Sequence, residues 1–317
     1  MVWDLTIVIP VCNEEKTLRQ TAVEIVKTLS DSDLSFGILC VDDGSKDSSW
    51  EVIEKLEREL PRKIQKLKLS RNFGKDAAIL AGLEHTNSEL VITMDADGQH
   101  PPKYLPKFIQ LWKKSGCNVI NGIKRSRQHD SLLQRAFAYA FNFIMEKVAG
   151  LDLHNASDFK FLDRKAKEAI IACEDRTIFF RGLVAWIGFN QQKIQFDVER
   201  RSRGLSQWGL QVLFFYAIDA IVLFSHFPVY FILALGGIAV LVCFVLLVIL
   251  GFALTEGNVP SGYSTLIVLL LMNLGFSMLA IGGIGLYVKH SLEQTMRRPR
   301  YVIDTNFKKS NDRDIEN

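Results

Sequence analysis

The sequence predicts an α/β protein in which a mostly parallel sheet carries helices on both faces and is followed by an interfacial helix and a hairpin of two transmembrane helices. Over the first 125 residues, apolar runs rich in β-branched residues alternate with amphipathic stretches. This alternation is typical of a parallel sheet that is covered on both faces. Beyond residue 219, two long segments contain no Asp, Glu, Lys or Arg, which predicts the membrane part.

The alternating part is expected to contain strands and helices in strict succession. The predicted strands are residues 5–11, 36–43, 64–70, 90–97 and 117–124. The predicted helices between them are residues 14–30, 48–60 and 75–86, where apolar side chains recur with the helical period. A further helix is expected after Asp163, which is well placed to cap it.

The two charge-free segments are Ala220–Thr255 and Gly257–Val288. Each exceeds the roughly 20 apolar residues that cross a bilayer core. We predict spans at about residues 228–254 and 264–288. Residues 208–227 are predicted to form a juxtamembrane helix in the interface, and the alternative is that they extend a tilted first span.

The charges that flank these segments predict the orientation of the chain. Lys289 and three arginines follow the second segment, whereas the connection between the segments has one acid and no base. The positive-inside rule therefore places both termini in the cytoplasm. Residues 1–207 are predicted to be a cytosolic catalytic domain, and residues 290–317 a basic, partly disordered tail in which Arg297 and Arg298 meet anionic lipid head groups.

The bulk composition excludes several classes of function. A formal net charge of +3 over 317 residues does not indicate a nucleic-acid-binding protein. The five cysteines are scattered and form no CxxC pair, which argues against a disulfide framework or a zinc site.

Polar clusters follow every predicted strand, and they are NEE, DDGS, RNFGK, DADGQH and KRSR. The carboxyl ends of parallel strands meet at one edge of a sheet, so the five clusters predict one binding site. In an extended segment Asp95 and Asp97 would point to the same side, with Gln99 one step further. Such oxygen ligands suit Mg²⁺ or Mn²⁺. The alternative is that both acids belong to an ordinary turn.

Asp42 and Asp43 directly follow the second strand. A carboxylate in this place can accept hydrogen bonds from a base N–H group or from ribose hydroxyls. The alternative is an Asx turn that leads into Gly44. Both interpretations can hold, one for each aspartate.

A family resemblance rests on six motifs, which occur in the order IPVCNEE, VDDGSKD, RNFGKDAA, MDADGQHPP, SDFKFLDRK and RRSRGLSQW. Followed by two spans, they resemble the inverting family-2 glycosyltransferases of the GT-A (Rossmann-like) fold. More narrowly, the chain resembles the polyprenyl-phosphate glycosyltransferases, the group that includes dolichol-phosphate mannosyltransferase and GtrB-type bactoprenol glucosyltransferases. The resemblance covers residues 5 to about 290.

The resemblance implies a role for each matching residue. It implies a nucleotide site formed by Pro10, Glu14, Asp42, Asp43, Lys75 and Asp95. It implies a site for Mg²⁺ or Mn²⁺ formed by Asp95, Asp97 and Gln99. It implies an acceptor-phosphate site formed by Lys124, Arg135, Arg200, Arg201 and Ser206. The catalytic residues implied are Asp158 and Asp97.

This sequence departs from the family pattern at three positions. Cys12 replaces a common aromatic residue, so stacking on the base is weaker and the nucleotide is left open. Lys124 replaces an arginine, which keeps the charge but loses bidentate phosphate binding. Gln207 replaces a lysine, whose charge Arg200 or Arg203 would supply.

Asp158 is an acid within an otherwise hydrophobic stretch. It is the candidate base, or else a group that orients the acceptor and stabilises positive charge on the sugar. A phosphate monoester has a second pKa of about 6, so the acceptor is already largely dianionic and nucleophilic at neutral pH. The structural alternative is a helix N-cap, although Asp163 is better placed for that.

The function that these observations and the resemblance imply is inverting transfer of a hexose to a polyprenyl phosphate. The donor is expected to be UDP-glucose and the acceptor undecaprenyl or dolichyl phosphate, giving a β-linked product. The alternatives are a processive polysaccharide synthase of the same family and a GDP-mannose-dependent mannosyltransferase. A metal-dependent phosphohydrolase and a non-enzymatic scaffold are more remote. The partners expected are the membrane and, by close packing of small residues in the spans, a second copy of the chain.

Overall fold

The computed structural model describes residues 3–125, 142–143, 145–147, 150–152, 156–174, 178–197, 262–296 and 298–304, with isolated positions between 232 and 252. The chain divides into two compact units, which we describe separately. The first unit is Met1–Phe143, Leu151–Leu210 and Arg298–Asn317, and the second is Ile144–Gly150 and Gln211–Arg297.

Seven strands form one sheet in the described part of the first unit, in the order β3-β2-β1-β4-β6-β5-β7. The strands are β1 (Leu5–Val11), β2 (Phe36–Asp42), β3 (Ile64–Lys68), β4 (Leu90–Thr93), β5 (Val119–Lys124), β6 (Ala156–Leu162) and β7 (Gln191–Phe196). Strand β6 is antiparallel to its neighbours β4 and β5, and the other pairs are parallel. All five predicted strands are present and run in the same direction, so their carboxyl ends share one edge.

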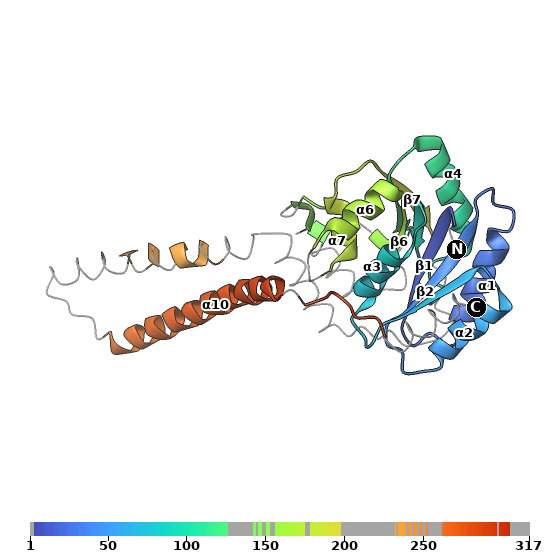
Figure 1. Ribbon diagram of the computed structural model, residues 1–317. Helices are drawn as coiled ribbons and strands as arrows, with labels where there is room; N and C mark the ends of the chain where they lie inside the picture. Colours follow the sequence, from blue (N-terminus) through green and yellow to red (C-terminus); the bar gives the residue numbers. More distant parts are fainter. Residues whose placement is uncertain are drawn as a thin grey trace. The chain divides into compact units, whose positions relative to one another are not determined.

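Helices cover both faces of this sheet (Figure 1). They are α1 (Leu18–Thr28), α2 (Ser49–Glu59), α3 (Lys75–His85), α4 (Leu105–Ser115), α6 (Arg164–Ala172) and α7 (Phe180–Trp186), with a 3-10 turn η1 (Pro102–Tyr104) before α4. Buried side chains of α1, α2 and α4 share one core with Leu5, Ile7 and Ile9 of β1. Those of α3, α6 and α7 share a second core with Val8. The predicted α/β class with a mostly parallel, two-faced sheet is therefore confirmed.

Strands β6 and β7 are not among the predicted strands, because neither has an apolar pattern. Strand β6 buries Lys160, whose Nζ donates a 2.5 Å hydrogen bond to Asn121 Oδ1 on β5. The amide of Asn121 in turn donates to Gln191 Oε1 on β7, at 2.8 Å. A lysine becomes acceptable inside a sheet only when neighbouring strands supply such partners.

The described part of the second unit is dominated by α10 (Tyr263–Thr295), a helix of 33 residues. Its stretch Met272–Lys289 is long and apolar enough to cross a membrane, and none of that stretch is buried. Large apolar side chains such as Leu270 and Ile281 are 61% exposed. This helix includes the predicted second span. The predicted interfacial helix at 208–227 and more than half of the first span lie outside the described residues, so the hairpin stays a prediction.

A short segment after α10 returns to the first unit and pairs with the edge of its sheet. Ile303 forms an antiparallel bridge with Leu69, directly after β3. The flanking backbone bonds are Ser70 N–H to Val302 C=O at 2.8 Å and Asp304 N–H to Lys68 C=O at 2.9 Å. Part of the predicted tail is therefore an ordered sheet partner, and residues 305–317 lie outside the described range.

Arg300 and Tyr301 attach the same segment to two helices. The Arg300 Nη1 group donates to the carbonyl of Cys173 at 2.6 Å, beside the C-terminal end of α6. Its guanidinium also pairs with Glu84 of α3 at 3.4 Å. The Tyr301 hydroxyl donates a short hydrogen bond to the same Glu84 carboxylate.

We expect Arg300→Ala to lower the unfolding midpoint of the first unit, with a loss of about 1–2 kcal/mol in the free energy of unfolding, because a charge-assisted bond to a helix end is removed. Thermal unfolding of the full chain in detergent measures this effect. Arg298→Ala is the matched control, because Arg298 is exposed two residues away. Equal midpoints for the two variants would contradict the anchoring role.

Candidate active site

The loops that follow β2 and β3 are locked together by a carboxylate. The two oxygens of Asp43 accept the backbone N–H groups of Phe73 and Gly74, at 2.7 and 3.0 Å. Gly44 has a φ of +64°, and a Cβ there would lie 2.5 Å from the backbone of Arg71 and Asn72. The turn DDG therefore needs its glycine, and it sets the start of α3 at Lys75.

The loop after β1 is bonded to the same turn. Asn13, with φ of 58°, accepts the N–H of Lys46 on its side-chain oxygen at 2.8 Å. The N–H of Glu14 donates to the hydroxyl of Ser49 at 2.7 Å. Pro10 is buried within β1 just before this loop. The first three polar clusters of the sequence thus form one connected edge.

Two roles are expected for Asp42 and Asp43, an acceptor for the nucleotide and an acid that forms the turn, and each aspartate is suited to a different one. Asp42 Oδ1 accepts the N–H of Ser45 at 3.3 Å, as in an Asx turn. Its Oδ2 is buried and, among the described residues, receives no hydrogen bond. Burial raises the pKa of Asp42. An unsatisfied buried acceptor is unfavourable unless a ligand supplies a donor. Asp42 therefore has the open acceptor of this pair, while Asp43 shapes the loop.

The buried Asp43 carboxyl predicts a pH-dependent stability. Burial raises its pKa from 3.8 to about 6, although the two N–H bonds favour the charged form. A raised pKa in the folded state means that this group stabilises the fold most below about pH 4, and that this contribution is lost as the pH rises through about 6.

We therefore expect the free energy of unfolding of the wild type, relative to that of Asp43→Asn, to increase by on the order of 2 kcal/mol as the pH falls from about 7 to 4. Unfolding midpoints of both proteins across this range measure the difference. A difference that is independent of pH would rule out titration of Asp43 in this interval.

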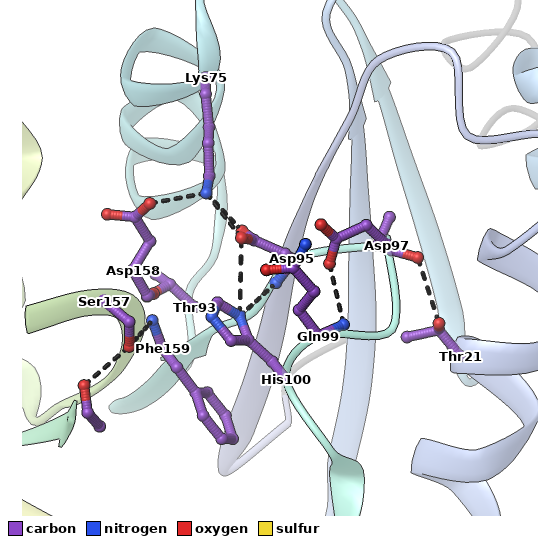
Figure 2. Close-up of polar contacts among 12 residues, drawn as sticks. Thr21, Lys75, Thr93, Asp95, Asp97, Gln99, His100, Ser157, Asp158 and Phe159 are labelled. Carbon is purple, nitrogen blue, oxygen red and sulfur yellow. Dashed lines mark hydrogen bonds and ion pairs between the residues drawn. The ribbon is translucent and has the colours of Figure 1, made fainter. Parts of the chain in front are cut away.

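Asp95 and Asp97 lie in a turn, so the prediction that the strand extends to residue 97, with both acids on one side of an extended segment, is wrong. Strand β4 ends at Thr93, and Gly98 has a φ of +78°. The Gln99 N–H donates to Asp97 Oδ1 at 3.0 Å and closes the turn (Figure 2). Asp97 is only 8% exposed.

His100 holds the other end of this turn. Its Nδ1 accepts the backbone N–H of Asp95 at 3.0 Å, so the ring proton lies on Nε2. The ring stacks on Phe159 of β6, with centroids 5.1 Å apart. Burial lowers the pKa of His100. The ring is therefore neutral, and its 3.7 Å approach to the Asp95 carboxylate is not an ion pair.

Lys75 joins the turn to β6 (Figure 2). Its Nζ lies 2.7 and 2.8 Å from the two oxygens of Asp95 and 2.6 Å from Asp158 Oδ2. Burial opposes the charged form of Asp95, but the Lys75 ammonium outweighs it and lowers the pKa of that carboxyl. Only Asp95 Oδ2 has hydrogen-bond geometry to Lys75, and within the described residues the buried Oδ1 accepts none.

Asp158 lies on β6 and receives a second cation from α7. Arg181 donates from Nε to Oδ1 at 2.6 Å and from Nη2 to Oδ2 at 2.7 Å. Burial opposes the charge of Asp158, but Arg181 and Lys75 together hold the pKa of that carboxyl well below its usual value. Asp158 is not a helix cap: Asp163 caps α6, as predicted, by accepting the Ala166 N–H at 2.8 Å.

The residues present fit a hard divalent cation. The donors at the β4 turn are carboxylate oxygens, and Asp95 Oδ1 is buried without a hydrogen bond among the described residues. No group of three or more His, Cys, Asp or Glu side chains with metal-site geometry occurs in the described part of the chain. Mg²⁺ needs no such cage, since it is commonly bound by one or two carboxylates together with substrate phosphates. Asp95 and Asp97 match that pattern, with Gln99 beside them.

The predicted acceptor residues are described only in part. Lys124 ends β5 beside Phe196, which ends the parallel strand β7. One residue further, Arg125 and Asp197 form a 3.1 Å ion pair. The ends of β5 and β7 therefore lie side by side, and the sequence after them contains the four other predicted residues. Those four, Arg135, Arg200, Arg201 and Ser206, lie outside the described residues.

Sequence reasoning missed Arg181 and His100. Arg181 stands in the run IFFRGLVAWIGF, where it is the one charged residue. A lone cation in an apolar run indicates a buried partner, as the lone acid Asp158 did in its own stretch. His100 gave no comparable signal, because its role depends on the fold of the turn.

Comparison with known proteins identifies the family. The model of glycosyl transferase family 2 matches residues 6–171. A relative from Synechocystis, the uncharacterised glycosyltransferase sll0501, is 33% identical over 96% of this chain and 95% of its own. The chain belongs to glycosyltransferase family 2. The matched region of this family 2 glycosyltransferase includes every predicted donor-side residue.

Other similar proteins have more specific names. A prophage bactoprenol glucosyl transferase homolog of Escherichia coli is 29% identical over 94% of this chain and 98% of its own. The bactoprenol glucosyl transferase of Shigella phage SfX is 28% identical over 94% and 98%. The structure of glucosyl-3-phosphoglycerate synthase from Mycobacterium tuberculosis with Mn²⁺, UDP-glucose and phosphoglyceric acid has a TM-score of 0.46 and 18% identity, covering 69% of this family 2 chain and 78% of its own.

Proposed function

We propose that this family 2 glycosyltransferase transfers a hexose, with glucose as the first candidate, from UDP-sugar to the phosphate of a polyprenyl phosphate. The observation that carries the proposal is the ion-pair chain Asp95–Lys75–Asp158 at the carboxyl edge of the sheet, in a protein that also has an apolar helix of membrane length. Alignment with bactoprenol glucosyl transferases over 94% of the chain supports the acceptor class.

The donor would occupy the edge formed by the loops after β1, β2 and β4. Asp42 Oδ2 would accept a base N–H or a ribose hydroxyl. Pro10, near the end of the neighbouring strand β1, and Glu14, in the loop after it, would complete the nucleotide site. Asp95 and Asp97 would hold Mg²⁺ or Mn²⁺, which as a Lewis acid neutralises the leaving nucleoside diphosphate. Lys75 adds a fixed positive charge 2.7 Å from Asp95.

The acceptor needs no strong base. The second pKa of a phosphate monoester is about 6, so the lipid phosphate is already an anionic nucleophile at neutral pH. Asp158 is held ionised by two cations. We therefore assign it the second of its two expected roles, in which it orients the acceptor and stabilises positive charge on the sugar. Attack on the anomeric carbon from the face opposite the leaving group inverts the configuration.

The acceptor phosphate is proposed to bind at the residues that follow β5 and β7. Lys124 is the described member, and Arg135, Arg200, Arg201 and Ser206 are the others. The adjacent ends of β5 and β7 support this grouping. The membrane is proposed as the location, with the catalytic unit and both termini in the cytoplasm. A homo-oligomer remains part of the proposal.

One assay tests this function. Purified full-length protein in detergent receives radiolabelled UDP-glucose, undecaprenyl phosphate and Mg²⁺ or Mn²⁺, with GDP-mannose in a parallel reaction. Metal-dependent label in an organic-soluble lipid is the expected result. Label only from GDP-mannose would identify a mannosyltransferase. Long polymer would indicate a synthase, and free sugar alone a hydrolase, and either would overturn the proposal.

A further inference from the structure

Arg181 forms a bidentate hydrogen-bonded ion pair with the carboxylate of Asp158. The two hydrogen bonds are 2.6 Å from Nε and 2.7 Å from Nη2, one to each carboxylate oxygen. The Asp158 side chain is 4% exposed. A bidentate guanidinium contact of this kind fixes both the position and the plane of a carboxylate, which a single point charge cannot do.

The same carboxylate is shared with the donor side of the site. Asp158 Oδ2 also accepts from Lys75 Nζ at 2.6 Å, and Lys75 continues to Asp95. Arg181 is therefore the outer member of a chain of alternating charges, Arg181–Asp158–Lys75–Asp95. The chain connects α7, β6, α3 and the turn after β4.

The packing of α7 does not depend on Arg181. Phe180, Leu183 and Val184 of this helix are buried in the core, at 1%, 2% and 0% exposure. The Arg181 side chain is 40% exposed. Its removal would leave the apolar contacts of α7 in place and open a space that small solutes can reach. Arg181 therefore acts through its ion pair with Asp158 and not through the packing of α7.

We propose that Arg181 is a positioning residue for sugar transfer, which holds Asp158 so that Asp158 in turn holds Lys75 against Asp95. The proposal rests on the proposed function, because Asp95 matters only as part of the leaving-group site. Without Arg181, the Asp158 carboxylate can rotate about its contact with Lys75 and draw the ammonium away from Asp95. The donor would still bind to the loops after β1 and β2, but the charges around the leaving group would be misplaced.

The test compares Arg181→Ala and Arg181→Lys with the wild type in the lipid-transfer assay. We expect kcat of Arg181→Ala to fall roughly 100-fold, the usual effect of a displacement of about 1 Å in a catalytic group, with the KM for UDP-glucose changed less than about threefold. Arg181→Lys keeps the positive charge but cannot make the bidentate contact with the carboxylate. Its kcat should therefore lie between those of the wild type and Arg181→Ala. Arg164→Ala is the matched control, because Arg164 makes an exposed ion pair with Glu168 at 2.8 Å on α6.

Chemical rescue with free guanidinium distinguishes a positioning role of Arg181 from a role in the stability of the fold. About 50 mM guanidinium should restore part of the activity of Arg181→Ala and none to Asp158→Asn, since only the first variant retains the carboxylate that binds the cation. In the double variant, Arg181→Ala should have almost no further effect on Asp158→Asn, because residues that act as a unit are strongly non-additive.

Each outcome decides for or against the role. Wild-type kcat in Arg181→Ala would overturn it, as would an additive double variant. A loss of kcat that rescue does not reverse, together with a lower unfolding midpoint, would make Arg181 a structural residue and also overturn it. Should Arg181→Ala fail to fold, the kcat and KM of Arg181→Lys decide in its place. Absence of lipid-linked product from the wild type overturns the proposed function itself, a result independent of any Arg181 variant.

Discussion

Replacing Lys75 with methionine is expected to abolish sugar transfer and to lower the free energy of unfolding by about 1–3 kcal/mol, because Lys75 is partly buried and Asp158, one of its two partners, is almost fully buried. The ammonium lies within 2.8 Å of two carboxylates, Asp95 and Asp158. Without it, the two acids face each other with Arg181 as the remaining cation of the chain. The pKa of both acids should rise, more for Asp95 than for Asp158, because Arg181 still lowers the pKa of Asp158.

Thermal unfolding and the lipid-transfer assay measure the two effects of Lys75→Met. Lys113→Met is the matched control: Lys113 pairs with Asp33 at 3.1 Å and both side chains are exposed, where an ion pair contributes about 1 kcal/mol or less. The double variant Lys75→Met/Asp158→Asn should recover part of the stability, because one unpaired charge is removed, but none of the activity. An unfolding midpoint equal to that of the wild type would contradict the proposed charge chain.

Replacing Asp97 with alanine is expected to reduce transfer by roughly 100- to 1000-fold with the fold intact, since the positive charge that stabilises the leaving group is lost with the metal. Alanine also removes the acceptor for the Gln99 N–H, which closes the turn. Asp97→Asn separates the two effects, because its amide oxygen can still accept that bond while the negative charge is absent. Both variants should therefore show this reduction in transfer, and only alanine should disturb the turn.

Titration of Mn²⁺ in the presence of UDP gives a readout for Asp97 besides activity. The wild type should bind Mn²⁺ together with UDP, and both variants should bind it at least about tenfold more weakly. Asp33→Ala is the control for a lost acid, because Asp33 is 86% exposed and pairs only with a surface lysine in the described structure. Near-wild-type metal binding or transfer by Asp97→Asn would remove Asp97 from the metal site.

The sequence predicted the donor edge of the sheet well. Mostly apolar strands that alternate with helices favour a covered parallel sheet, and five polar clusters at their ends then share an edge. The details of that edge could not be read from the pattern. Asp42 and Asp43 are adjacent and chemically identical, yet Asp43 is saturated by two loop N–H groups and Asp42 keeps an open acceptor. That difference arises from the path of a loop thirty residues away.

The second half of the sheet and of the site was harder to predict. Lys160 interrupts the apolar pattern of β6, and only the structure shows the Asn121 oxygen that satisfies it. Arg181 lies 23 residues from Asp158 along the chain, on a different element. Pairings of this kind are set by the packing of α7 on the sheet rather than by local periodicity. The segment around Ile303 is too short for any period to be recognised.

The strand partner at residues 302–304 has a consequence for how the protein is made. By residue 197 a ribosome has produced every strand of the seven-stranded sheet, but the backbone groups of Lys68 and Ser70 at its outer edge have no partner yet. Their partner is translated only after the apolar segments, which at usual rates takes about 5–20 s more. During that interval the first unit presents an open sheet edge, the feature that promotes wrong pairing between chains. Completion of the sheet thus depends on translation of the apolar segments, and a nascent chain stalled within them would keep this sheet edge open.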